Sequence, residues 1–483
     1  MGFALYFMRG YIFYINIIFI LIIILIEKRN PLYTLFWITI LILAPYLGFV
    51  LYLLLGLKYF RRRRAEKFSD WKSARKGSII RTSDRPDLLK WKQLISYLEI
   101  STQNKLTKNN RMEIFIRGPK LFERMIEDLK NAEEFIFMEY YIFHDGQLTR
   151  KISEILIEKA RAGKRVKLII DGASTVRNSK LKELRKAGCE VKRFFPWNIL
   201  FLKIANLRVN YRDHRKLTVI DGKIGYTGGF NIGDEYLGKG PLGPWRDTAI
   251  RISGECVRDL QREFMYFWGM VTKTKSEALD QAKLPVGEDN DVPSVQDDHG
   301  DTKYLQVVSS GPNYDYRTMR DNFLKIILEA QRYICIQTPY FVPDEFILEA
   351  LRLAATSGVN IKIMIPEKAD HIFMKWVNQY FAGELLDLGV EIYRYQKGFI
   401  HSKLILADNE IVSVGSANMD YRSLYQNFEV NVNIYDEEIV RMFHQIFKHD
   451  IRSAHRFSKK LYSKRDVLVK LKESVFRLLA PIL

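Results

Sequence analysis

The pattern His-x-Lys-x-x-x-x-Asp occurs twice in this chain, each time on a strand-like run of apolar and β-branched residues. One copy reads HRKLTVID from His214, and the other reads HSKLILAD from His401. Five segments recur around them in the same order: a strand, a helix, a second strand, a helix leading into a third strand, and the strand with the pattern. Such alternation is typical of a mostly parallel sheet. We therefore expect an α/β protein built from two tandem α/β/α repeats.

The repeated segments also set the expected domain boundaries. A chain of 483 residues is too long for one ordinary core. The segment between the repeats is polar and acidic and contains Pro285 and Pro293, which predicts a solvent-exposed linker. The expected order is a membrane anchor at 1–60, a basic connector at 61–110, the first repeat at 111–272, an acidic linker at 273–302 and the second repeat at 303–483.

The N-terminal residues are strongly apolar. Residues 10–26 and 31–57 contain no charged side chain. A hydrocarbon core of about 30 Å is crossed by roughly 20 apolar residues, so we expect two transmembrane helices before the repeats. Lys58 and the four arginines at 61–64 form a basic collar after the second span. Since basic residues favour the cytoplasmic side, both the N-terminus and the repeats are expected there, in a multi-pass protein of the cell membrane.

The two copies agree at further polar positions when they are aligned on the histidine. The aligned pairs are Lys216 and Lys403, Asp221 and Asp408, Gly229 and Ser416, Asn231 and Asn418, and then the carboxylates Asp247 and Glu429. Residues i and i+2 of a strand point to the same face, so each His and Lys are expected to lie side by side. Asp221 and Asp408 lie beyond the strand, where spacing permits either a turn residue or a direct catalytic role.

If the repeats pack with pseudo-twofold symmetry, their His-Lys pairs meet in one cleft that is suited to a tetrahedral phosphate. One imidazole can attack phosphorus while the other donates and accepts the proton of the exchanging hydroxyl. Lysine and asparagine side chains can stabilise the charge on the phosphoryl oxygens. Asp247 and Glu429 can hold the imidazoles in the required tautomer. Because the protein supplies the positive charge, we expect no metal and no other cofactor.

These motifs resemble those of the phospholipase D superfamily and, within it, the bacterial cardiolipin synthases. The resemblance rests on the doubled pattern followed by GGFN and GSAN, on MEYYIF, GPWRDT and QTPYFVP, and on the paired apolar segments. It implies transfer of a phosphatidyl group between two phosphatidylglycerol molecules through a phosphohistidine, giving cardiolipin and glycerol. The catalytic set that it implies is His214, Lys216, Asp221, His401, Lys403 and Asp408, and the expected substrate-binding residues are Asn231, Asn418, Asp247 and Glu429.

Other functions remain open from the sequence. The same chemistry serves a hydrolytic phospholipase, with water as the acceptor, and a membrane-tethered nuclease, which the net charge of +19 would also suit. A non-enzymatic membrane adaptor is disfavoured because neither copy has lost a reactive residue. We expect anionic membrane lipids rather than nucleic acid as partners; the oligomeric state is not predicted. Residues 459–483 place apolar side chains at helical spacing among basic ones, which suits a helix packed on the second repeat or a helix lying on a membrane.

Overall fold

The computed structural model describes residues 17–18, 20–21, 31–51, 88–172, 174–175, 178–194, 211–272, 303–478 and 480. The chain divides into two compact units, one made of residues 1–75 and 196–211 and the other of 76–195 and 212–483. The predicted linker at 273–302 lies outside the described residues, as does most of the apolar segment 10–26.

The first unit contains two described helices, α2 (Pro31–Leu43) and α3 (Pro45–Leu51). Pro45 is the first residue of α3, a position where a proline costs no intrahelical hydrogen bond. In the part of the chain that the structure describes, no helix is both long enough and apolar enough to cross a bilayer.

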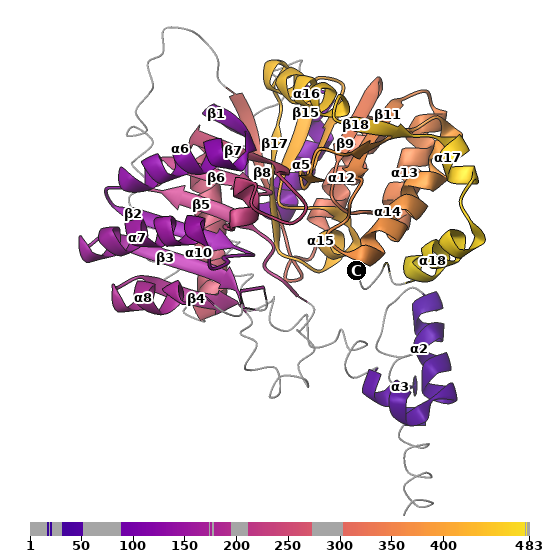
Figure 1. The fold of residues 1–483 in the computed structure, drawn as a ribbon, viewed down its shortest axis with the longest axis horizontal. Coiled ribbons are helices and arrows are strands. Elements are labelled where there is room, and N and C mark those ends of the chain that lie inside the picture. Colours follow the sequence, from indigo (N-terminus) through magenta and orange to yellow (C-terminus); the bar gives the residue numbers. More distant parts are fainter. Residues whose placement is uncertain are drawn as a thin grey trace, which may run out of the picture. The chain divides into compact units, whose positions relative to one another are not determined.

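One mixed sheet runs through the second unit (Figure 1). Its strands from the first repeat are β1 (Thr107–Arg117), β2 (Phe135–Tyr140), β3 (Arg165–Asp171), β4 (Glu190–Phe194), β5 (Lys216–Ile220), β6 (Ile224–Gly228) and β7 (Trp245–Gly254). Those from the second are β8 (Lys303–Ser310), β9 (Tyr333–Gln337), β11 (Asn360–Pro366), β12 (Glu391–Tyr395), β13 (Phe399–Ile400), β14 (Leu404–Ala407), β15 (Ile411–Gly415), β17 (Glu429–Ile434) and β18 (Ala454–Phe457). A separate pair joins β10 (Phe341–Val342) to β16 (Met419–Asp420).

The strand order has an internal symmetry. From one edge inward the first repeat contributes β4-β3-β2-β5-β6-β7-β1, and the second contributes β12-β11-β9-β14-β15-β17-β8. The two series match strand for strand in chain order, and they meet where β1 pairs with β8 antiparallel. In each series the first three strands are mutually parallel and the next three antiparallel. The predicted α/β fold with two tandem repeats is thereby confirmed, and the sheet is mixed.

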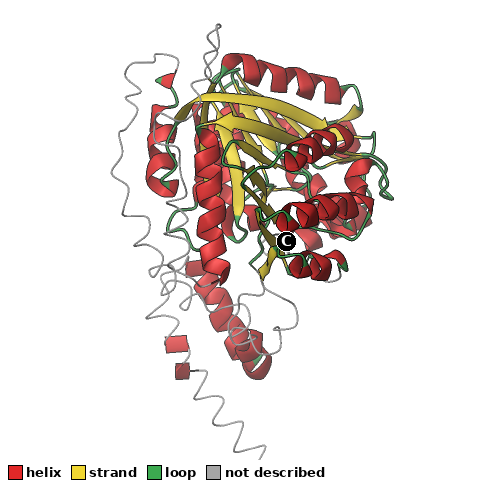
Figure 2. Ribbon diagram, turned by 90° about the vertical axis from the view of Figure 1, so that its left-hand side faces the viewer, coloured by secondary structure: helices red, strands yellow, loops and turns green. Residues whose placement is uncertain are grey.

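Helices cover both faces of the sheet (Figure 2). In the first repeat they are α6 (Gly118–Lys130), α7 (Gln147–Arg161), α8 (Lys180–Lys186) and α10 (Cys256–Thr272), with a short 3-10 helix η7 (Asp234–Leu237). In the second they are α12 (Thr318–Glu329), α13 (Glu345–Thr356), α14 (Ile372–Glu384), η8 (Leu386–Leu388), α15 (Tyr421–Tyr425) and α16 (Glu437–Ile451). Helices α10 and α16 share one apolar core, while α6–α8 and α12–α13 close separate cores. Strands such as β2 are therefore buried along their whole length, as in covered parallel sheets.

The ends of the second unit pack on the second repeat. Helix α5 (Lys92–Thr102) lies in the range predicted as a connector, yet Trp91, Leu94 and Leu98 join the core of the second repeat. The sequence around α5 carries apolar residues at helical spacing, and this signal outweighs its charged flanks. At the C-terminus, α17 (Lys459–Ser463) and α18 (Val467–Arg477) follow β18, and α18 packs against α14.

Candidate active site

Each histidine of the repeated pattern is held by the opposite repeat. The backbone N–H of His214 donates to the carbonyl of Phe428, just before β17, at 3.0 Å. The N–H of His401, just after β13, donates to the carbonyl of Arg246 in β7 at 2.8 Å. These contacts follow from the sheet, because β7 and β17 occupy equivalent central positions in the two strand series. The pseudo-symmetric backbone thus brings both copies of the pattern to the boundary between the repeats.

The carboxylates are exchanged in the same way. Glu429 of the second repeat lies against His214 of the first, with Nδ1 to Oε1 at 2.9 Å and to Oε2 at 3.1 Å. Asp247 of the first repeat lies against His401 of the second, with Nδ1 to Oδ2 at 2.6 Å. An ionised carboxylate only accepts hydrogen bonds, so each Nδ1 carries the proton and each Nε2 keeps its lone pair in the neutral ring.

The two lysines complete one shared cluster. Lys216 Nζ donates to the carbonyl of His214 at 2.6 Å, and Lys403 Nζ donates to the carbonyl of His401. Lys403 Nζ also lies 2.8 Å from His401 Nδ1 and 3.9 Å from Asp247 Oδ2. Beside the larger effect of burial, the charge of Lys403 contributes to lowering the pKa of His214, and that of Lys216 contributes to lowering the pKa of His401. The four basic side chains of the two repeats therefore belong to a single site.

Burial governs the protonation of this cluster. It lowers the pKa of His214 to about 4, against the opposing charge of Glu429, and it lowers the pKa of His401 to about 4 as well. Both imidazoles are consequently neutral near pH 7. Burial also lowers the pKa of Lys216 to about 7 and that of Lys403 to about 8. A group that loses its charge so readily is stabilised as a cation by an incoming anion.

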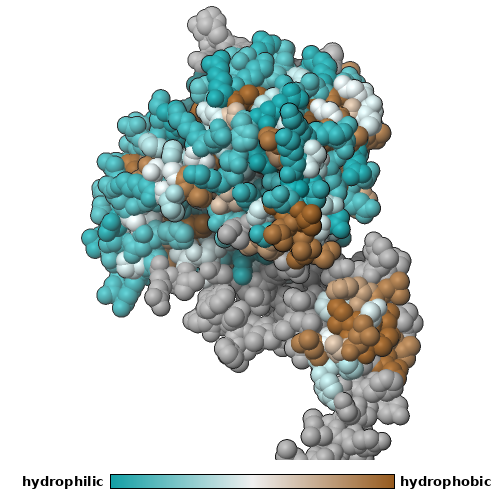
Figure 3. Space-filling model, turned by 45° about the vertical axis from the view of Figure 1, so that its right-hand side comes forward, coloured by the Kyte–Doolittle hydropathy of each residue, from teal (hydrophilic) through white to brown (hydrophobic). Residues whose placement is uncertain are grey.

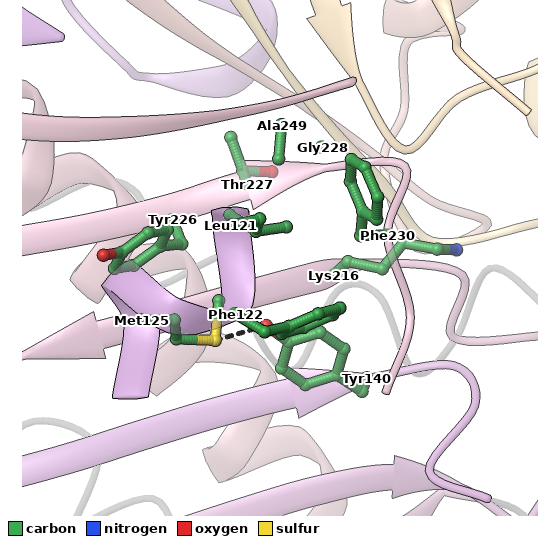
Figure 4. Close-up of a pocket in the computed structure, with 10 residues that line it drawn as sticks. All are labelled: Leu121, Phe122, Met125, Tyr140, Lys216, Tyr226, Thr227, Gly228, Phe230 and Ala249. Carbon is green, nitrogen blue, oxygen red and sulfur yellow. Dashed lines mark hydrogen bonds between the residues drawn. The ribbon is translucent and has the colours of Figure 1, made fainter. Parts of the chain in front are cut away.

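A small apolar pocket next to β5 explains the burial of Lys216 (Figure 4). Leu121 and Phe122 of α6 and Phe230 line it, together with the stem of Lys216. In the figure the lysine lies at the edge of the group and its nitrogen points away from Met125 and Tyr226. The stem is thus packed in hydrocarbon, while the ammonium group is directed away from the pocket.

The two asparagines are close to the histidines but engaged differently. Asn231 accepts from the backbone N–H of Ile142 at 3.1 Å and donates to the hydroxyl of Tyr236 at 3.0 Å. Asn418 donates to Asp420 at 3.0 Å. Its carbonyl oxygen Oδ1 is buried and has no hydrogen-bond partner among the described residues. Only Asn418 therefore keeps a free polar atom at this place.

Asp221 and Asp408 lie at the far end of the pattern strands and contact the backbone. The Asp221 carboxylate accepts from the N–H groups of residues 133, 134 and 135 at 2.7–2.8 Å, which holds the start of β2. Asp408 accepts from the N–H groups of residues 331, 332 and 333 at 2.7–2.9 Å. Both have positive φ, at 53° and 57°. Of the two roles that spacing left open, these contacts favour the turn residue.

Several residues of the cluster carry no signal in the pattern alignment. Ser416, Ser423 and Asn427 donate to Glu429 at 2.5, 2.8 and 3.3 Å. The hydroxyl of Tyr236 lies 3.3 Å from His401 Nδ1. Ser416 stands at the aligned position of Gly229 and was visible on that ground. The others come from loops of different length in the two repeats, so one sequence gives no register for them.

Comparison with known proteins identifies the family. The family model "Cardiolipin synthase, PLD-like domain" matches residues 125–268 and 323–451. The chain belongs to this family. A second model, "Phospholipase D-nuclease N-terminal", matches residues 15–56. Similar curated proteins are "Cardiolipin synthase 1" of Staphylococcus epidermidis, 39% identical over 98% of this chain and 97% of the relative, and "Cardiolipin synthase" of Oceanobacillus iheyensis, 38% identical over 98% of each. "Cardiolipin synthase" of Listeria monocytogenes is 37% identical over 97% of each.

A solved structure supports the fold independently. The phosphatidylserine synthase of Haemophilus influenzae superposes with a TM-score of 0.57, over 77% of this chain and 95% of that chain, at 14% sequence identity. Identity this low speaks for the fold alone. The resemblance inferred from the motifs is thus confirmed at family level.

Proposed function

We propose that this protein is a membrane-bound phosphatidyltransferase that joins two phosphatidylglycerol molecules into cardiolipin and releases glycerol. The observation that carries the proposal is the crossed arrangement in which Glu429 binds His214 and Asp247 binds His401. Family membership supports the same activity, since relatives at 37–39% identity over nearly the whole chain are named cardiolipin synthases.

In the first half-reaction a neutral histidine attacks the phosphodiester. Its Nε2 forms a bond to phosphorus while the bond from phosphorus to the oxygen of the departing glycerol breaks. The other histidine gives that oxygen a proton and becomes neutral. The phosphodiester charge raises the pKa of this second histidine from its low value in the empty site, so that it carries a proton when substrate is bound. The resemblance favours His214 as the nucleophile and His401 as the acid.

In the second half-reaction the phosphohistidine passes its phosphatidyl group to a second phosphatidylglycerol. The acceptor hydroxyl gives its proton to the acid-base histidine, its oxygen bonds to phosphorus, and the phosphorus–nitrogen bond breaks. Lys216 and Lys403 stabilise the phosphoryl oxygens in both steps. Asn231 and Asn418 are the further candidates for contact with the headgroup, and the unpartnered Oδ1 of Asn418 suits a hydroxyl donor. Asp247 and Glu429 position the imidazoles rather than meeting the substrate, and Asp221 and Asp408 hold the strands.

The site lies next to the membrane in this proposal. Residues 10–26 and 31–57 serve as the anchor, and the basic collar after them places the N-terminus and the site in the cytoplasm. A tethered enzyme would meet anionic lipids of that leaflet. Hydrolysis of phosphatidylglycerol to phosphatidic acid is the alternative outcome at the same site, with water in place of the second hydroxyl.

The decisive experiment replaces one histidine at a time. Because both imidazoles act on one phosphorus atom, His214→Ala and His401→Ala should each lower turnover of labelled phosphatidylglycerol by at least about a hundredfold, as expected for loss of a nucleophile or of an acid-base group. Products are separated as cardiolipin and phosphatidic acid, with Leu353→Glu, an exposed change on α13, as the control. If either single variant kept about half of the wild-type activity, the repeats would be two independent centres.

A further inference from the structure

Helix α18 carries a concentrated stripe of exposed apolar side chains. Of the thirteen large hydrophobic side chains that are exposed within the described part of 88–480, five lie on α18 and the residue that ends it. They are Val467 (80% exposed), Leu468 (69%), Leu471 (58%), Val475 (50%) and Leu478 (69%). At 3.6 residues per turn these five positions fall within an arc of roughly 100°. In Figure 3 a brown patch interrupts the largely teal surface at this place.

The opposite side of the helix fixes it to the catalytic unit. Glu473 is almost fully buried, and Arg465 forms an ion pair with it. Phe476 and Ala480 pack into an apolar cluster with Met374 and Val377 of α14. The exposed stripe therefore takes no part in seating the helix. A stripe this large on a folded protein marks an interaction surface.

Basic and aromatic side chains border the stripe. Lys472 lies on one side, with its Nζ 5.3 Å from the ring centre of Trp376. On the other side are Lys470 and Arg477, and Arg477 donates to the hydroxyl of Tyr380 at 2.5 Å. Tryptophan, tyrosine and lysine next to an apolar helix face are typical of a helix that lies in the interface of a bilayer. The positive charges match anionic headgroups, each contributing about fivefold in surface binding.

The helix beneath the stripe leads to the candidate site. Helix α14 begins two residues after Asp370, whose charge contributes to the pKa of Lys403. Within α14, Asn378 accepts from the N–H of Phe341 at 2.8 Å and donates to the carbonyl of Pro339 at 2.8 Å. Phe341 starts β10, which pairs with β16 directly after Asn418. A surface that holds α18 thus holds the mouth of the site through a single helix.

We propose that α18 docks in the plane of an anionic phospholipid bilayer, with its apolar stripe inserted between headgroups, and so presents the site to lipid substrate. The anchor at 1–60 would bring the chain to the membrane, whereas α18 would orient the catalytic unit upon it. The charge border favours a bilayer over a second copy of this basic chain, which would bring like charges together.

The first test measures insertion directly and does not depend on the proposed function. The cysteines Cys189, Cys256 and Cys335 are buried, so a maleimide fluorophore reports on a cysteine introduced at the surface. Full-length Leu471→Cys is labelled and reconstituted in vesicles of phosphatidylglycerol and nitroxide-labelled phosphatidylcholine. Because an interfacial helix inserts its apolar face by about 5–10 Å, we expect roughly threefold quenching. The control is Glu437→Cys on α16, whose side chain is 68% exposed.

Quenching at residue 471 no greater than that at residue 437 would overturn the proposal, as would cross-linking of Leu471→Cys between two chains in place of quenching. The second test compares Leu468→Glu/Leu471→Glu with Leu353→Glu, a leucine of matched exposure at 57%. We expect the double variant to raise the KM for phosphatidylglycerol in vesicles at least about tenfold, as a lost apolar insertion should. Turnover of a monomeric short-chain phosphatidylglycerol should stay unchanged. Equal loss with both substrates, or loss with neither, would contradict the docking role.

Discussion

At the scale of single residues, the site depends on buried cations that lose their charge easily. In the free protein the pKa of Lys216 is lowered to about 7 and that of Lys403 to about 8, mainly by burial. Above these values the lysines are neutral and attract a phosphodiester less strongly. We therefore predict that kcat/KM falls as pH rises through 7 to 8. Bound substrate favours the charged lysines, so the fall in kcat should lie at higher pH. Profiles of initial rate against pH would check both; a kcat/KM that stays flat to about pH 9 would contradict the assignment.

Gly229 is a second residue-scale determinant, because it makes room for the carboxylate of Asp247. A Cβ built at this position would lie 2.0 Å from Asp247 Oδ1, which is a steric overlap. Gly229→Ala should displace Asp247 from His401 and lower kcat by about a hundredfold, with a smaller effect on KM, since the histidine loses its orienting partner. Ser416→Ala is the matched change in the other repeat; it removes one of the donors to Glu429 and should cost less. A Gly229→Ala enzyme with wild-type kcat would show that Asp247 does not position His401.

At the scale of secondary-structure elements, Asp221 and Asp408 act as clamps between strands. Each accepts three backbone N–H groups at the start of β2 or β9. Asparagine tolerates the positive φ but retains only one acceptor oxygen. We predict that Asp221→Asn lowers the free energy of unfolding by about 1–2 kcal/mol and leaves kcat within a factor of about three. Denaturant unfolding and steady-state assays on the same preparation measure the two. A hundredfold loss of kcat at unchanged stability would return Asp221 to the chemistry.

The elements also show what the sequence could reveal. Pattern and periodicity predict the strands that carry Lys216 and Lys403, the repeated order and the pairing of equivalent positions, since these depend on local spacing. The exchange of Asp247 and Glu429 between repeats could not be predicted in this way. It depends on β7 and β17 lying at the centre of one sheet, a long-range property. The packing of α5 against the second repeat was missed for the same reason, because its partners lie more than two hundred residues away.

At the scale of the whole molecule, the two repeats form one catalytic unit because the sheet is continuous across them. Strands β1 and β8 pair at the centre, β13 pairs with β7, and His214 and His401 each bond to the backbone of the other repeat. Helix α5 adds apolar contacts from the N-terminal side to the second repeat. None of these contacts uses residues 273–302. The covalent connection between the repeats is therefore not what holds the site together.

This argument predicts the effect of cutting the chain there. A protease site introduced within 273–302 and cleaved after purification should leave two fragments that co-purify and keep most of the wild-type activity, because the interactions across the sheet and the crossed carboxylates remain. Gel filtration in detergent and the phosphatidylglycerol assay would measure this. Cleavage within the β5–β6 turn, for example at Lys223, is the matched control and should abolish activity, since that turn joins two strands of the sheet. Separation of the fragments under native conditions would mean that the sheet contacts do not suffice and that the linker supplies the missing stability.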